Sequence, residues 1–199
     1  MEIYTARYYW VFVLLVALLW TNCDRLSVKE SFDGVRYELT DHRNESVILP
    51  DTFKGKILLV GYVYTHCPDV CPMITQKMQA VERELDKEEV HFVSITFDPD
   101  RDTPEILANY ARNFNLNEER WTLLTGQREV VDSLLDRLGI RTVKTPTRFT
   151  DKGEASYFID HTDRVSLIDK KGRVRRHYPG SQLDPDIVLR DIRKLGLNL

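Results

Sequence analysis

The stretch KILLVGYVYTHCPDVCP, residues 56–72, joins an apolar run to two closely spaced cysteines. Residues 56–65 form a continuous run rich in aliphatic and aromatic side chains, which is typical of a strand buried on both faces at the centre of a sheet. Beyond residue 72, apolar side chains recur at helical spacing, which predicts an amphipathic helix of about four turns. The cysteines therefore lie between the end of a central strand and the start of a helix, where α/β sheets place their functional sites.

The rest of the chain alternates between strand and helix patterns. The predicted strands cover 90–97, 121–125, 164–169 and 173–178, and the predicted helices start near residue 102 and cover 128–140 and 183–196. The polar stretch 141–155 is either a long functional loop or an inserted hairpin before the penultimate strand. This order predicts an α/β fold with a mixed central sheet flanked by helices.

Composition indicates one globular domain and excludes several classes of protein. The 199 residues are 42% hydrophobic and 30% charged, which suits one domain with a substantial core. A formal net charge of -3 gives no electrostatic basis for binding nucleic acid. Three cysteines are too few for a disulfide-stapled scaffold, so their positions carry the chemical information.

The N-terminus predicts attachment to a membrane. An unbroken apolar run from Tyr8 to Trp20 has the length of a signal-peptide core and is shorter than the roughly 20 residues of a membrane span. Cys23 follows closely, as in a bacterial lipoprotein signal, where the cysteine becomes the lipidated first residue. The alternatives are an uncleaved anchor and an inert thiol at Cys23.

These observations predict a division of the chain into three parts. Residues 1–23 form a signal peptide or membrane anchor, 24–45 a tether, and 46–199 the folded domain. The domain is expected to face the periplasm or the outside of a bacterial cytoplasmic membrane, where thiols oxidise unless they are maintained.

Each cysteine of the pair precedes a proline, which disfavours helical backbone at the residue before it. We therefore expect the helix to begin at Pro72, with Cys71 at its N-cap and Cys67 on the preceding loop. The positive end of a helix favours the thiolate form of a nearby cysteine. Three intervening residues permit a redox disulfide and also permit both sulfurs to bind one metal ion, so both interpretations stay open.

Two thiolates alone leave most metal ions with too few ligands, and a histidine is the expected third. In a thioredoxin-like sheet, the turn before the penultimate strand faces the cysteine motif, which favours His161. His66 is adjacent to the pair, but neighbouring residues on extended backbone point to opposite sides. Asp160 is either the residue that orients the His161 imidazole or an ordinary turn aspartate.

Four stretches in this order resemble the Sco/SenC family of thioredoxin-fold copper-binding proteins. They are THCPDVCP at 65–72, SITFDPDRDTPE at 94–105, LLTG at 123–126 and YFIDHTDRVSLIDKKG at 157–172. The resemblance implies a thioredoxin-like fold in which Cys67, Cys71 and His161 ligate copper. It further implies delivery of copper to the binuclear copper centre of a haem–copper respiratory oxidase, or thiol–disulfide exchange that serves the cysteines of that centre.

The chemistry of these ligands agrees with the resemblance. Two thiolates and one imidazole form a soft set that suits Cu(I), and with a weak extra ligand it can hold Cu(II). We expect a metallochaperone rather than an enzyme. Its expected partners are a copper-accepting oxidase subunit and a thiol reductant or upstream copper donor. The alternative is a membrane-tethered thiol–disulfide oxidoreductase that uses a Cys67–Cys71 disulfide; only metal binding needs His161.

Overall fold

A computed structural model of the chain describes residues 26–85, 90–149 and 155–196. Its helices are η1 (Asp51–Phe53), α2 (Val70–Arg83), α3 (Pro104–Asn113), α4 (Arg128–Arg137) and α5 (Pro185–Lys194). Its strands are β1 (Glu30–Ser31), β2 (Tyr37–Asp41), β3 (Ser46–Leu49), β4 (Ile57–Val63), β5 (Val90–Thr96), β6 (Trp121–Thr125), β7 (Thr142–Lys144), β8 (Arg148–Phe149), β9 (Ala155–Ser156), β10 (Ile159–His161), β11 (Val165–Ile168) and β12 (Arg173–Tyr178).

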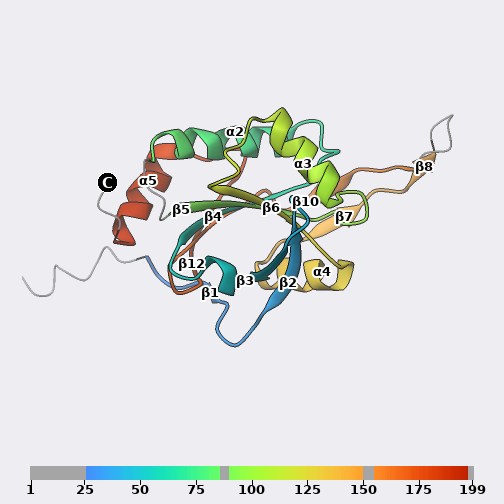
Figure 1. The fold of residues 1–199 in the computed structure, drawn as a ribbon. Helices are drawn as coiled ribbons and strands as arrows, with labels where there is room; N and C mark the ends of the chain where they lie inside the picture. The colour runs from blue at the N-terminus through green and yellow to red at the C-terminus, as the bar shows by residue number, and fades with distance from the viewer. Residues whose placement is uncertain (1–25, 86–89, 150–154, 197–199) are drawn as a thin grey trace, which may run out of the picture.

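Eight strands form one mixed sheet in the order β1-β12-β11-β4-β5-β6-β2-β3 (Figure 1). Strands β4, β5 and β6 run parallel, and β11 pairs antiparallel with β4. Helices α2 and α3 cover one face of the sheet and α4 covers the other (Figure 1). This arrangement confirms the predicted thioredoxin-like α/β fold, which matches the solved structures compared below.

Strand β4 separates the two cores of the domain. All seven of its residues are buried, as the continuous apolar run predicts. Leu58, Val60 and Tyr62 belong to the core beneath α4, whereas Ile57 and Leu59 belong to the core beneath α2, α3 and α5. The strand therefore holds the cysteine loop that follows it on a rigid, doubly buried support.

The N-terminal part of the described chain differs from the predicted tether. Strands β1 and β2 lie within residues 24–45, yet β1 pairs with β12 and β2 pairs with β6 in the main sheet. The physical reason is the alternation in β2, where Tyr37, Leu39 and Asp41 are buried and Glu38 is exposed. Residues 1–25, with the apolar run and Cys23, lie outside the described residues. Within the part that is described, no helix is long and apolar enough to cross a bilayer.

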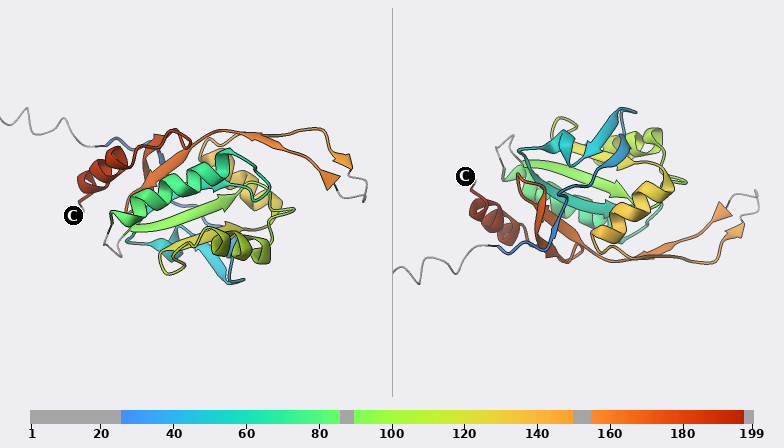
Figure 2. Two further views of the ribbon diagram at one scale, coloured as in Figure 1. Left: turned by 90° about the horizontal axis from the view of Figure 1, so that it is seen from above. Right: turned by 90° about the horizontal axis from the view of Figure 1, so that it is seen from below.

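The polar stretch 141–155 belongs to an inserted hairpin, one of the two forms that the sequence allows. Strand β7 pairs with β10, and further out β8 pairs with β9. The arm extends away from the body of the domain, at the end opposite α5 (Figure 2). Because β10 ends at His161, this hairpin carries the expected third ligand.

Gly61 in β4 gives a prediction about packing beneath α2. A Cβ at this position would lie 2.6 Å from Met78 Sδ, which is closer than packed atoms approach, and Met78 is fully buried. We expect Gly61→Ala to lower the free energy of unfolding by about 1–2 kcal/mol, measured by urea denaturation, because the methionine must leave its packed position. The Gly61→Ala/Met78→Ala double variant should cost less than the sum of the single changes, and strict additivity would contradict the clash.

Candidate metal centre

The cysteine loop connects β4 to α2, but the helix begins earlier than predicted. Cys67 lies on the loop as expected, whereas Cys71 is the second residue of α2 and Asp69 is the N-cap. The first backbone N–H groups of a helix have no intrahelical partner, so Pro72 in the first turn costs no hydrogen bond. The helix thus accommodates the proline after Cys71, and the first-turn position holds this sulfur at the helix N-terminus.

The hairpin brings His161 to the cysteine pair. One ligand atom from each of Cys67, Cys71 and His161 lies within 4.8 Å of the other two, and His161 Nε2 is 3.9 Å from Cys71 Sγ. Both cysteines are free thiols. Of the remaining histidines, His66 lies beside the loop but contacts Thr65 and Asp102 instead. The candidate ligands from the sequence thus come together from two segments that lie ninety residues apart.

The imidazole of His161 is held by its own strand end and by an aromatic ring. Its Nδ1–H donates to the carbonyl oxygen of Thr162 at 3.1 Å, which leaves Nε2 facing the sulfurs. The ring of Phe97 packs against it with 4.5 Å between centroids. Asp160 is exposed, and the Thr162 carbonyl occupies the orienting position that the sequence suggested for its carboxylate.

The two thiols differ in acidity because they share a proton. A hydrogen bond from Cys71 favours the Cys67 thiolate, and a further hydrogen bond from His161 adds to this; together they outweigh burial and lower the pKa of Cys67 to about 3. The same interaction with Cys67, together with burial, raises the pKa of Cys71. Burial lowers the pKa of His161, but its hydrogen bonds to Cys67 and Thr162 outweigh this and raise it. Without a metal, the centre therefore holds a Cys67 thiolate beside a Cys71 thiol.

A buried carboxylate fixes the end of β4, which the sequence did not reveal as part of the site. Asp102 accepts hydrogen bonds from Thr65 Oγ1 at 2.6 Å, from the Thr65 backbone N–H at 3.1 Å and from Thr96 Oγ1 at 2.6 Å. Burial raises the pKa of the Asp102 carboxyl, and the hydrogen bonds from Thr65 and Thr96 lower it only in part, so the pKa stays above its ordinary value. Asp102 with Thr65 and Thr96, called here the Asp102 bracket, joins the ends of β4 and β5 directly before the cysteine loop. In the sequence, the only signal for it is that Asp102 lies within the stretch SITFDPDRDTPE.

A second polar cluster anchors the base of the hairpin. Tyr157 donates from its hydroxyl to Asp98 Oδ1 at 2.8 Å, and Arg101 pairs with Asp98 while its guanidinium lies 3.5 Å from the centre of the Tyr157 ring. Asp98 follows β5, so this cluster ties the hairpin to the main sheet. These contacts help to hold the hairpin that carries His161 against the main sheet.

The centre opens into a pocket of about 360 Å³. It is lined by Tyr64, Cys67, Asp69, Val70, Phe158, Ile159, Asp160, His161 and Asp163. Phe158 at its wall and Val143 on the same hairpin are 53% and 65% exposed, unusual for such large apolar side chains. The pocket gives another molecule access to Cys67 and His161 past an apolar rim.

Residues 27–196 match the family described as SCO1/SenC. The chain belongs to the SCO1/SenC family. It is 31% identical over 147 residues to a SCO2-like protein of Rickettsia prowazekii. The matched residues cover 73% of this chain and 68% of the Rickettsia protein. Its fold superposes on copper-bound ScoI of Bradyrhizobium japonicum with a TM-score of 0.65 and 29% identity, over 81% of this chain and 98% of that one. A SCO1/SenC family lipoprotein of Bacillus anthracis gives a TM-score of 0.69 at 25% identity, over 87% and 98% of the two chains.

Proposed function

We propose that this protein is a membrane-anchored metallochaperone that binds one copper ion through Cys67, Cys71 and His161. The observation that carries the proposal is the convergence of two sulfurs and one imidazole nitrogen within 4.8 Å at an open pocket. The copper-bound state of the Bradyrhizobium relative supports the choice of metal. Soft thiolates select Cu(I), and the imidazole extends the set toward Cu(II).

The geometry prepares the ligands for this cargo. Cys67 already carries a negative charge in the metal-free protein, and binding displaces the proton of Cys71, so uptake releases a proton. The Thr162 carbonyl holds His161 Nδ1–H, so Nε2 becomes the ligand atom once it gives up its hydrogen bond to Cys67. We propose the binuclear copper centre of a haem–copper respiratory oxidase as the acceptor, in line with the family. A contribution of Asp160 to transfer stays a prediction.

The second candidate is a thiol–disulfide oxidoreductase, and one observation favours it. Cys67 is partly exposed and its pKa is about 3, which keeps it as the thiolate that attacks disulfides. A Cys67–Cys71 disulfide would then form through a mixed disulfide with the acceptor, whose own disulfide is reduced to two thiols. This reaction uses the same cysteines but needs no ligand from His161.

His161→Ala separates the two functions. The reduced protein is expected to bind one equivalent of copper and to show a sulfur-to-copper charge-transfer band in its Cu(II) form. In His161→Ala we expect the band to disappear and Cu(II) affinity to fall by about 100-fold or more, because one of three ligands is lost. His66→Ala is the matched control and should keep both. Unchanged copper binding in His161→Ala would contradict the three-ligand site, and full disulfide reductase activity in that variant would favour the oxidoreductase.

We propose attachment through the N-terminus, by a lipid on Cys23 or by an uncleaved anchor. The apolar run Tyr8–Trp20 supports attachment, and the Bacillus anthracis relative is described as a lipoprotein. The domain would then face the periplasm or the outside of the cytoplasmic membrane. Mass spectrometry of the mature N-terminus distinguishes the two forms of attachment.

A further inference from the structure

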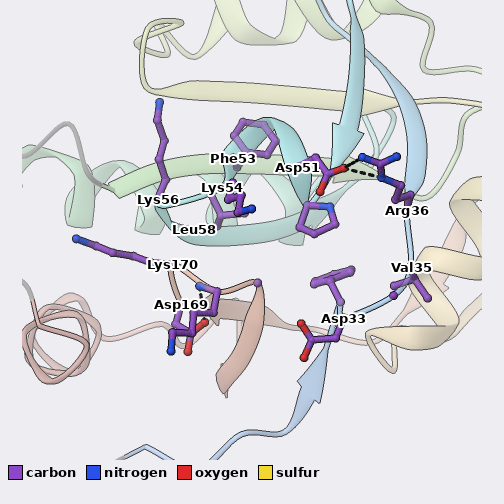
Figure 3. Close-up of a pocket in the computed structure, with 15 residues that line it drawn as sticks. Asp33, Val35, Arg36, Asp51, Phe53, Lys54, Lys56, Leu58, Asp169 and Lys170 are labelled. Atoms are coloured by element: carbon purple, nitrogen blue, oxygen red, sulfur yellow. Dashed lines mark hydrogen bonds and ion pairs between the residues drawn. The ribbon is translucent and has the colours of Figure 1, made fainter.

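A group of lysines surrounds a hollow at the end of the sheet opposite the metal centre. Lys54, Lys56, Lys170 and Lys171, called here the basic end, come from the segment before β4 and from the turn between β11 and β12. They border a cavity of about 480 Å³ whose floor includes Phe53 and Leu58 (Figure 3). Nothing in the proposed copper chemistry uses this part of the molecule.

The charges at the basic end are only partly neutralised. Asp51 pairs with Arg36, and Asp169 pairs with Arg173 and Arg175. Lys54, Lys56 and Lys171 have no ion pair within residues 26–85, 90–149 and 155–196. Lys54 and Lys171 are also exposed. Asp51 and Asp169, two of the three acids that line the hollow, are thus occupied by arginines, and Asp33 is the third. The lysines therefore outnumber the remaining acid, and the hollow offers positive charge to an anionic partner.

The position of the basic end in the sheet follows from strand register. Strand β11 runs antiparallel to β4, with Ile168 beside Leu58 and Val165 beside Gly61. The turn at 169–172 therefore lies at the start of β4, whereas His161 and Cys67 lie beyond its other end. At about 3.3 Å per residue, the length of β4 separates the basic end from the metal centre by roughly 20 Å.

The chain enters the domain beside this same end. Arg175 donates a hydrogen bond to the carbonyl oxygen of Leu26, the first described residue. Leu26 lies three residues after Cys23, so a lipid on Cys23 would lie at most about 11 Å from Leu26. An uncleaved anchor that ends at Trp20 would lie at most about 20 Å from Leu26. The Debye length at physiological salt is about 8 Å. Attachment at the N-terminus therefore keeps the domain close enough to a membrane surface for the basic end to come within this distance of it.

We propose that the basic end docks on anionic phospholipid headgroups of the membrane that holds the N-terminus, with Lys54, Lys56 and Lys171 on lipid phosphates. This inference rests on the proposed membrane attachment but is independent of copper binding. Each lysine close to an anionic bilayer strengthens binding by about fivefold. The docked orientation holds the metal centre on the far side of the domain, roughly 20 Å from the basic end.

The test uses the full chain, reduced and reconstituted into vesicles of phosphatidylcholine alone or with roughly one-third phosphatidylglycerol. A membrane-impermeant amine-acetylating reagent is added, and lysine modification is followed by peptide mass spectrometry. Lys144 on the hairpin lies at the opposite end and serves as the internal reference. We expect Lys54 and Lys171 to react about threefold or more slowly, relative to Lys144, on the anionic vesicles only. High salt should remove the difference.

The variant Lys54→Glu/Lys171→Glu is the matched control. In it, Lys56 should react equally on both kinds of vesicle, while copper stoichiometry stays at the wild-type value and reports that the domain is folded. Equal reactivity of wild-type Lys54 and Lys171 on both vesicles would overturn docking, whatever the copper result. A chain that floats with neither kind of vesicle would overturn the attachment and the docking together.

Discussion

Replacing Cys71 with alanine is expected to raise the pKa of Cys67 well above its value of about 3. The largest influence on the Cys67 thiolate is its hydrogen bond from the Cys71 side chain, which alanine cannot replace, whereas the backbone N–H of residue 71 still donates to the Cys67 sulfur. The hydrogen bond from His161 persists, so the pKa should stay below the ordinary value of about 8.5. If it reaches 6 or higher, the thiolate fraction at pH 5 falls by about tenfold or more.

The pH midpoint of Cys67 alkylation, followed by peptide mass spectrometry to separate it from Cys23, measures this change. The matched control is Cys67→Ala, in which Cys71 should resist alkylation at pH 5 because it is fully buried. A midpoint that stays near 3 in Cys71→Ala would show that the two sulfurs do not share a proton. The helix N-terminus and His161 would then have to hold the thiolate alone.

Replacing Asp102 with alanine is expected to lower the free energy of unfolding by about 3 kcal/mol. The change removes the acceptor of the partly buried Thr65 hydroxyl and of the buried Thr96 hydroxyl, and hydrogen bonds to a charged group contribute about 1.5–3 kcal/mol each. Burial raises the pKa of Asp102 in the folded protein above its ordinary value of 3.8. The contribution of Asp102 to the free energy of unfolding is therefore full below 3.8 and falls as the pH rises through the folded-state pKa. The cost of the substitution should therefore be larger near pH 4 than at pH 7.

Urea denaturation at both pH values measures the effect of Asp102→Ala. Asp160→Ala is the matched control, since Asp160 is exposed beside the same site and its loss should change stability by less than about 0.5 kcal/mol. Equal effects of the two substitutions would mean that the bracket does not stabilise the cysteine loop. A cost that grows with pH would contradict the raised pKa.

The elements that the sequence predicts well are those that local pattern determines. The run at 56–65 became β4 because every residue in it is buried, and Thr103 and Pro104 start α3 with the hydroxyl of Thr103 accepting from Ile106 N–H. Strand order then placed His161 near the cysteines, because β11 pairs with β4. Each of these steps needs only periodicity, capping and the topology of the fold.

The features that the sequence did not reveal depend on contacts between distant residues. Pairing of β2 with β6 joins residues about eighty positions apart, so residues 24–45 looked like a tether. The Asp102 bracket spans β4 and β5, and the hold of Thr162 on the imidazole uses a backbone carbonyl, which no side-chain pattern encodes. The sequence predicts a start of α2 at Pro72 because residues before proline disfavour helical backbone, but this steric effect is a preference, and Cys71 adopts the helix in spite of it. Pro72 is tolerated there because first-turn N–H groups have no intrahelical partner.

The two sulfurs of the centre differ in how accessible they are to another molecule. Cys71 is fully enclosed, whereas Cys67 and His161 line the open pocket. An acceptor thiolate can reach Cys67 and His161 through this pocket, so we expect it to displace one of them before the bond to Cys71 breaks. Copper would then exchange its ligands in a fixed order, and the bond to the buried sulfur of Cys71 would break last.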